Sequence, residues 1–270
     1  MKKTIIAVFF AAMTFAAVSC SDKKEDKLSE TENTTASEAV STEDVTDEVT
    51  TEDEKAKRRR EEFEEAMERC ADITMQELPE YDIPDDWHEI NNGTVKMLVP
   101  SNVEETEKMD SSLVSNEYQN EDDSVHIIFH HFTKWDEGCL YDYRAPELSE
   151  ELVAKALSKL GIDYDGTRVS MIKAITSFTS ADKTEKNEKA YRIASMEKAA
   201  EFDWYSCIFH NMSDGHDVFI KGDYNSYYPD DEMDYAFVNI FSDSNNSYSV
   251  RVEAPSEEEI LMMCSTLSFS

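Results

Sequence analysis

The chain is poor in the residues that most catalytic and metal-binding motifs require. It has six glycines and six prolines among 270 residues, and no glycine-rich loop of the kind that cradles phosphate groups. No serine has the G-x-S-x-G context of a hydrolase nucleophile. None of the five cysteines has C-x-x-C spacing, which excludes zinc-ribbon and thioredoxin-like sites. These absences leave no catalytic motif, and we expect a protein that is not an enzyme.

Positive charge is scarce as well. Lys and Arg together number 26, against 59 Asp and Glu, which gives a net charge of −33. A surface of this sign repels phosphate backbones and anionic lipid, so we expect no nucleic-acid partner. The same charge favours solubility and, where partners exist, cationic ones.

The apolar run at the N-terminus is too short to cross a membrane. Lys2 and Lys3 precede it, and it extends over 5–18 with only Thr14 interrupting. A spanning helix needs about 20 apolar residues. A basic start followed by a short apolar region is instead typical of a signal peptide, here residues 1–19.

The end of this run, Ala17-Val18-Ser19-Cys20, resembles the bacterial lipobox. In lipoproteins with that motif the cysteine is diacylated and the signal is cut immediately before it, and the family favours leucine where Ala17 stands. The resemblance implies an extracytoplasmic chain attached to a bacterial membrane by a diacylglyceryl-modified Cys20, and two acyl chains are enough for stable attachment. The alternative is an ordinary secretory signal that is cut after Ala17 or Ser19.

Residues 20–56 have the composition of a spacer. Positions 21–56 contain 13 Asp or Glu against four Lys, a net charge of −9, and no aromatic residue. Such a segment cannot bury enough apolar area to offset chain entropy, so we expect an acidic, Ser/Thr-rich, disordered tether.

Residues 57–79 are expected to form an amphipathic helix and linker. An apolar stripe at helical spacing is formed by Phe63, Met67, Cys70 and Thr74. The pattern predicts one helix over 53–77, which Pro79 ends.

Residues 80–270 are long enough for one globular domain with a substantial core. Apolar patterning predicts strands over 94–99, 113–118, 125–132, 168–178, 190–196, 202–209, 217–221, 235–241 and 248–252. The stretch 125–132 is apolar on both faces, which indicates a central strand.

Two helices are expected in this domain. Ser149 caps the first and Gly161 ends it, with an apolar stripe formed by Leu152, Val153, Ala156, Leu157 and Leu160. A capping box over 256–259 opens the second, whose buried face is formed by Ile260, Met263, Cys264 and Leu267. The predicted fold class is α+β, an antiparallel β-sheet packed by helices.

The order of these elements resembles the PsbP-like domains. The resemblance rests on the strand that ends at Pro100, the helix over 152–160, the antiparallel strands that follow, and the closing helix that leads into 265–269. It covers roughly residues 90–270, with long insertions around 134–146 and 222–234. PsbP-like domains are generally interaction or assembly modules, so the resemblance implies a protein without catalytic residues.

The histidines do not form a recognisable metal site. His126 and His130 share a strand face but lie about 13 Å apart, too far for one ion, and His131 faces the opposite side. Asp163 begins a short stretch like a calcium loop, but Ala174 stands where the bidentate glutamate is needed. We therefore predict no metal ion and no cofactor.

The remaining cysteines leave two alternatives open. Cys70, Cys139, Cys207 and Cys264 are able to form two disulfides in an oxidising compartment. Cys207 lies in a predicted strand and Cys264 on a buried helix face, where each resembles a small core residue. These positions favour free thiols.

One segment, 222–235, stands out as a candidate binding loop. Tyrosines and carboxylates crowd it, and the candidate residues are Asp223, Tyr224, Tyr227, Tyr228, Asp230, Asp231 and Asp234. Tyrosine makes adaptable contacts with sugars, cations and proteins, and clustered carboxylates suit Ca²⁺ or a basic partner. The alternative is an exposed acidic hairpin whose tyrosines pack on the sheet edge.

These features predict a membrane-anchored extracytoplasmic lipoprotein whose domain is a non-enzymatic interaction module for an envelope protein. The alternative is a lipoprotein that binds a divalent cation or a glycan through the 222–235 loop. A third hypothesis is an envelope hydrolase whose catalytic residues the sequence does not reveal.

Overall fold

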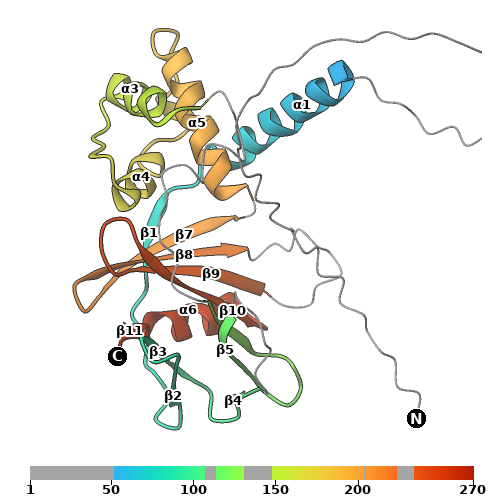
Figure 1. Cartoon of the computed structure of the whole chain (residues 1–270), viewed down its shortest axis with the longest axis vertical. Helices are drawn as coiled ribbons and strands as arrows, with labels where there is room; N and C mark the ends of the chain where they lie inside the picture. Colours follow the sequence, from blue (N-terminus) through green and yellow to red (C-terminus); the bar gives the residue numbers. More distant parts are fainter. Residues whose placement is uncertain (1–51, 107–113, 131–147, 204, 224–233) are drawn as a thin grey trace, which may run out of the picture. The chain divides into compact units, whose positions relative to one another are not determined.

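The computed structural model describes residues 52–106, 114–130, 148–203, 205–223 and 234–270 (Figure 1). These lie in one compact unit that extends from Thr50 to Ser270. Cys20 and most of the expected tether fall outside the described residues. Within the described part of the chain, no helix has the length and apolar character needed to span a membrane.

The described strands form two sheets. The larger has eight strands in the order β1-β7-β8-β9-β10-β6-β5-β4, and the smaller has the order β11-β3-β2. The strands are β1 (Met75–Glu77), β2 (His88–Asn91), β3 (Val95–Val99), β4 (Glu104–Glu105), β5 (Val114–Gln119), β6 (His126–His130), β7 (Cys207–Ser213), β8 (His216–Asp223), β9 (Asp234–Phe241), β10 (Ser247–Ala254) and β11 (Ser268–Phe269).

The helices are α1 (Glu52–Cys70), α3 (Glu150–Leu160), α4 (Arg168–Ile175), η1 (Ser180–Asp182, a 3-10 turn), α5 (Glu188–Phe202) and α6 (Glu257–Ser265). Both helices expected from caps are confirmed. The Ser149 hydroxyl accepts a hydrogen bond from the Leu152 amide, and Gly161 ends α3 with a φ of 77°. The Ser256 hydroxyl likewise accepts from the Glu259 amide. The predicted α+β class is confirmed.

The central strands supply side chains to two different cores. Phe209 and Val218 belong to the core that contains α6, whereas Ile208 and Phe219 belong to the core formed with α3, α4 and α5. Successive residues of a strand point to opposite faces, so β7 and β8 are covered on both sides. Figure 1 shows α6 against one side of the large sheet, with α3, α4 and α5 gathered together beyond β7.

The strands expected over 168–178 and 190–196 are wrong, because residues 168–175 form α4 and residues 190–196 lie in α5. The Thr167 hydroxyl accepts a hydrogen bond from the Ser170 amide and so starts α4 as a capped helix. Most residues of α4 and α5 are buried, so neither helix shows a clear polar face. A short apolar run of this kind does not distinguish a buried helix from a buried strand.

Two element boundaries also differ from the prediction. The strand expected over 202–209 begins only at Cys207, because Phe202 is the last residue of α5. The helix expected over 53–77 ends at Cys70, and the chain then forms β1, which pairs with β7 in parallel. The large sheet is therefore antiparallel except for this pair.

Lys198 fixes the end of α1 against α5. Its ammonium is buried and donates hydrogen bonds to the carbonyl oxygens of Ala71, at 2.9 Å, and Phe178, at 2.8 Å. It also lies 4.9 Å from the centre of the Phe178 ring. Burial lowers the pKa of Lys198 to about 8, although nearby Cys70, Asp72 and Asp182 oppose the shift. The Ala71 carbonyl, which directly follows α1, thus finds a partner in the adjacent helix.

A buried ionic cluster joins the helices to the sheet. Glu201 of α5 forms ion pairs with Arg168 of α4 and with Lys221 of β8, the latter at 3.1 Å. All three side chains are less than one-tenth exposed. Burial alone would raise the pKa of Glu201, but the charges of Arg168 and Lys221 outweigh it and lower the pKa to about 2.

We predict that Glu201→Gln destabilises the fold by about 3–5 kcal/mol, because it removes the carboxylate charge that pairs with two buried cations. Chemical denaturation at neutral pH measures this change. Glu188→Gln is the control, since Glu188 makes an exposed ion pair with Lys183 and its loss should cost less than about 1 kcal/mol. Equal effects of the two variants would contradict a structural role for the cluster.

Candidate functional site

The candidate loop leaves the large sheet between two central strands. Strand β8 ends at Asp223 and β9 begins at Asp234, and Asp223 pairs with Tyr235 across the two strands. The other candidate residues, Tyr224, Tyr227, Tyr228, Asp230 and Asp231, lie outside the described residues. The structure therefore shows the base of the loop, where its two ends are held in register by the sheet.

A row of polar side chains continues from this base across the sheet. The pairing places Tyr235 opposite Glu253, and Glu253 opposite His126. The side chains of these residues share one face, because directly paired residues point to the same side of a sheet. Arg251 lies two residues before Glu253 on β10. Glu117 lies two residues before Gln119 on β5, and Gln119 pairs with His126. Both side chains therefore point to the same face as the others.

The side chains of this row contact one another in sequence. The Arg251 guanidinium lies 5.3 Å from the Tyr235 ring centre and 2.5 Å from the Glu253 carboxylate. His126 lies between two carboxylates, with Nε2 at 2.6 Å from Glu117 and Nδ1 at 3.3 Å from Glu253. Charges and aromatic rings are thus fixed in place beside the loop base, and we refer to Tyr235, Arg251, Glu253, His126 and Glu117 as the polar row.

The two carboxylates control the protonation of His126. The hydrogen bond to Glu253 raises the pKa of His126, burial opposes this, and Glu117 raises it further. A protonated imidazole donates from both ring nitrogens, which matches a carboxylate at each. Burial would raise the pKa of Glu253, but the hydrogen bond from His126 and the charge of Arg251 lower it.

We predict that His126→Gln loses stability mainly at acidic pH. A raised pKa in the folded state stabilises the fold below the unfolded value of 6.5, and this contribution is lost as pH rises through the folded pKa. The difference in unfolding free energy between parent and variant should be roughly 1–3 kcal/mol at pH 6 and smaller at pH 9.

Nuclear magnetic resonance titration of the ring gives an independent measurement, and the His126 pKa should exceed 6.5. For the stability measurement, His216→Gln is the control, because His216 packs against the Phe269 ring, with 4.5 Å between ring centres, rather than between carboxylates. A His126 pKa below that of a free histidine would contradict the arrangement.

The other described histidines are spread over the two sheets. His210 lies 2.7 Å from Asp217, which also accepts from Lys173, and the His130 ring packs 5.8 Å from Phe237. His131 lies outside the described residues. Among the residues that the structure describes, no group of three or more His, Cys, Asp or Glu side chains is arranged to hold a metal ion.

Two of the three described thiols are buried in the protein interior, and that of Cys207 is partly buried. Cys70 and Cys264 are free and buried. Burial raises the pKa of Cys70 to about 11, with the charge of Asp203 adding to it, and burial raises the pKa of Cys264 further still. Such thiols stay protonated and unreactive. Cys207 lies in β7 with its sulfur 3.9 Å from the Gly222 carbonyl oxygen, and Cys139 falls outside the described residues.

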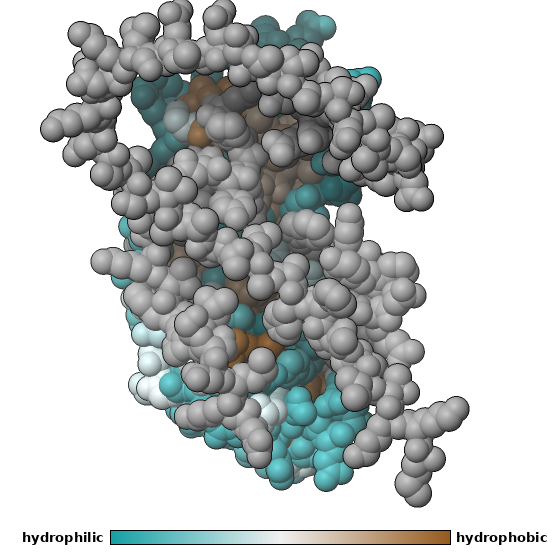
Figure 2. Space-filling model, turned by 45° about the vertical axis from the view of Figure 1, so that its right-hand side comes forward, coloured by the Kyte–Doolittle hydropathy of each residue, from teal (hydrophilic) through white to brown (hydrophobic). Residues whose placement is uncertain are grey.

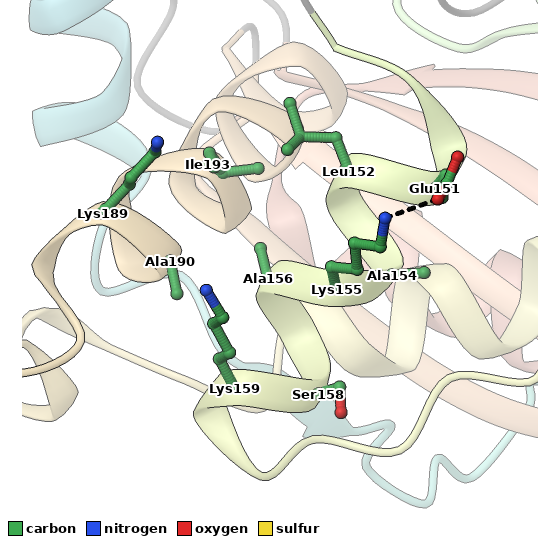
Figure 3. A pocket seen from close by; sticks show the side chains of 10 residues that line it. All are labelled: Glu151, Leu152, Ala154, Lys155, Ala156, Ser158, Lys159, Lys189, Ala190 and Ile193. Carbon is green, nitrogen blue, oxygen red and sulfur yellow. Dashed lines mark hydrogen bonds and ion pairs between the residues drawn. The ribbon is translucent and has the colours of Figure 1, made fainter.

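The sequence did not reveal the hollows that flank α5. One lies against α3 and has a volume of about 580 Å³ (Figure 3). It is lined by Glu151, Leu152, Ala154, Lys155, Ala156, Ser158, Lys159, Lys189, Ala190 and Ile193. The predicted helix contains the α3 lysines at i,i+4 spacing, but the sequence pattern over 190–196 predicts a strand. The pairing of the two helices therefore could not be foreseen.

A second hollow of about 600 Å³ lies between α1 and α5. Most of its charged lining residues pair with one another, Glu64 with Arg192 and Lys183 with Glu188. The Ser195 hydroxyl is buried at its wall, and no hydrogen-bond partner for it is found among the described residues. The paired charges leave no clear preference for a ligand of either sign.

Figure 2 shows one face of the molecule, on which hydrophilic residues form most of the surface that is not grey, with hydrophobic residues between them. Among the described residues, the one large hydrophobic side chain that is exposed is Met212, at 52%. The described surface therefore offers no large apolar patch, and binding surfaces must be sought where polar and apolar groups are combined.

Comparison with known proteins shows limited similarity. The solution structure of cyanobacterial PsbP (CyanoP) from Synechocystis sp. PCC 6803 is similar over 72% of this chain and 99% of that chain. Its sequence identity to this chain is 8% and its TM-score is 0.35. It belongs to the family that the order of elements resembles. No family model and no curated protein matches the chain.

Proposed function

We propose that this chain is an extracytoplasmic lipoprotein, attached to a bacterial membrane through acylated Cys20. We further propose that its α+β domain serves there as a non-enzymatic interaction module. The signal-peptide pattern of residues 1–19 and the acidic composition of residues 20–56 support the first part. The base of the 222–235 loop supports the second.

The observation that carries the interaction is the rigid base of this loop. The ends of the loop are paired in two central strands, and the neighbouring polar row has its charges and rings already fixed by mutual contacts. Binding residues are commonly carried on loops that a rigid scaffold positions, because the scaffold pays little entropy on association. Residues 224–233 contain the tyrosines and carboxylates that such contacts use.

The chemistry of this region favours a cationic protein partner. Residues 223–234 contain five carboxylates and no lysine or arginine, and the domain as a whole is strongly acidic. Complementary charge speeds association and selects against acidic partners. Tyrosine supplies contact area at a small cost in side-chain entropy.

We predict that Cys20→Ala abolishes acylation and releases the domain from the membrane. Labelling of growing cells with radioactive palmitate, followed by separation of membrane and soluble fractions, measures both effects. Ser19→Ala is the control, because it keeps a small residue before the cysteine and should leave acylation unchanged. A Cys20→Ala chain that remained bound to the membrane would overturn the proposed anchor.

We predict that Tyr227→Ala combined with Tyr228→Ala removes the principal partner captured by crosslinking in intact envelopes. The expected loss is at least tenfold in crosslinked product, since tyrosines at an interface often contribute about 2 kcal/mol or more. Met212→Ala is the control, because Met212 is exposed near the β7–β8 turn, at the opposite end of β8 from the loop. Unchanged crosslinking in the double tyrosine variant would reject the loop as the contact surface.

Variants of the same segment distinguish a ligand-binding lipoprotein from an interaction module. A rise in melting temperature with millimolar Ca²⁺ or with a glycan, lost in Asp230→Asn with Asp231→Asn, would favour a ligand-binding lipoprotein. No such response, together with a partner lost in the tyrosine variant, is the outcome that the interaction module predicts.

A further inference from the structure

The hollow between α3 and α5 combines an apolar floor with a cationic rim. Leu152 and Ala156 of α3 face Ala190 and Ile193 of α5 across it, and two of these four side chains are half-buried rather than fully buried. Its volume of about 580 Å³ lies in the range of small-molecule sites, roughly 300–1,000 Å³. We call it the lysine groove.

Three lysines line this groove in a chain whose net charge is −33. Lys155 and Lys159 come from α3 and Lys189 from the first turn of α5. The Lys155 ammonium is paired with Glu151 at 2.5 Å. For Lys159 and Lys189, the structure shows no ion pair within the part of the chain that it describes. Figure 3 shows the Lys159 side chain extending from α3 toward Ala190 of α5.

The geometry points to an anionic single-chain amphiphile as the occupant of the lysine groove. We propose that an acyl or alkyl chain lies over Leu152, Ala156 and Ile193, and that a carboxylate or phosphate head is held by Lys159 and Lys189. The apolar floor selects for hydrocarbon, and the two ammonium groups select for negative charge at its end. Neither feature alone would define the ligand, but together they exclude cationic and purely polar molecules.

The competing account is that the lysine stems only cover apolar surface while their charges remain in water. That account predicts no bound ligand and no dependence of binding on head-group charge. In the hollow between α1 and α5, Lys183 and Arg192 already have carboxylate partners, whereas Lys189 lines both hollows. The proposal is independent of the 222–235 loop and of the anchor at Cys20.

Isothermal titration of residues 20–270 carrying Cys20→Ala tests the proposal with matched probes below their critical micelle concentrations. Laurate and dodecyl phosphate should bind at one site per chain, whereas dodecyltrimethylammonium and butyrate should bind at least tenfold more weakly. Comparison of the affinities for laurate and dodecyl phosphate also distinguishes a fatty-acid ligand, which carries a carboxylate, from a lysophospholipid-like ligand, which carries a phosphate. Equal affinity for the anionic and cationic twelve-carbon probes would overturn the proposal.

Variants of the groove and of lysines elsewhere complete the test. Lys159→Glu with Lys189→Glu should weaken laurate binding at least tenfold, and Leu152→Gln should weaken it severalfold. Lys57→Glu with Lys96→Glu makes the same change of charge outside the groove and should leave the affinity within twofold. Thermal unfolding by circular dichroism verifies that each variant is folded before it is titrated.

The acidic segment of this chain is the rival occupant. A peptide of residues 38–51 alternates valines with carboxylates and is the probe for it. One outcome is that the peptide binds the parent chain and displaces laurate, and that its binding is abolished in the double lysine variant. In that case the groove binds an acidic peptide and the amphiphile proposal is overturned. If the double lysine variant binds laurate as tightly as the parent does, the lysine groove is rejected as the site.

Discussion

Glu201 is the buried charge at which the helical layer meets the large sheet. It projects from α5 and forms ion pairs with Arg168 of α4 and Lys221 of β8, so one carboxylate connects three separate elements. A charge at this depth is tolerated only when its partners are in place, because desolvation of an isolated ion costs far more than folding can supply. The position of α4 and α5 on the sheet is therefore coupled to a single ionic geometry.

The two-sided burial of β7 and β8 follows from the same arrangement. One face of these strands packs toward α6, and the other packs toward the helices that Glu201 holds. Where that second face continues onto β9, β10 and β6, it carries the polar row instead of an apolar core. The same sheet face thus changes from a packing surface to a fixed set of charges and rings beside the loop base.

The two proposed binding regions use different physical means. The 222–235 loop is supported by strands whose hydrogen bonding fixes its ends, and the contacts would come from tyrosines and carboxylates of the loop itself. The lysine groove is formed by the pairing of two helices, so its apolar floor exists only when α3 lies against α5. The proposed loop site prefers cationic partners, and the proposed groove site prefers anionic ligands.

The sequence by itself determined the α+β class, the capped helices α3 and α6, and most strands of the sheet. These elements depend on local signals: Ser149 and Ser256 accept hydrogen bonds from their own first turns, and β3 alternates buried with partly exposed side chains. The sequence also supplied the candidate residues of the loop and Cys20, because composition and motif are properties of the chain alone.

Only the tertiary structure decided the nature of α4 and α5, the parallel pairing of β1 with β7, and the existence of the lysine groove. Residues 168–175 and 188–202 are buried on most sides, so the polar face that identifies a helix in a sequence is missing. The polar row depends on strand register, which brings Glu117, His126, Glu253 and Arg251 together from three strands. The contact between His126 and Glu253 joins residues 127 positions apart, and no local pattern encodes such a contact.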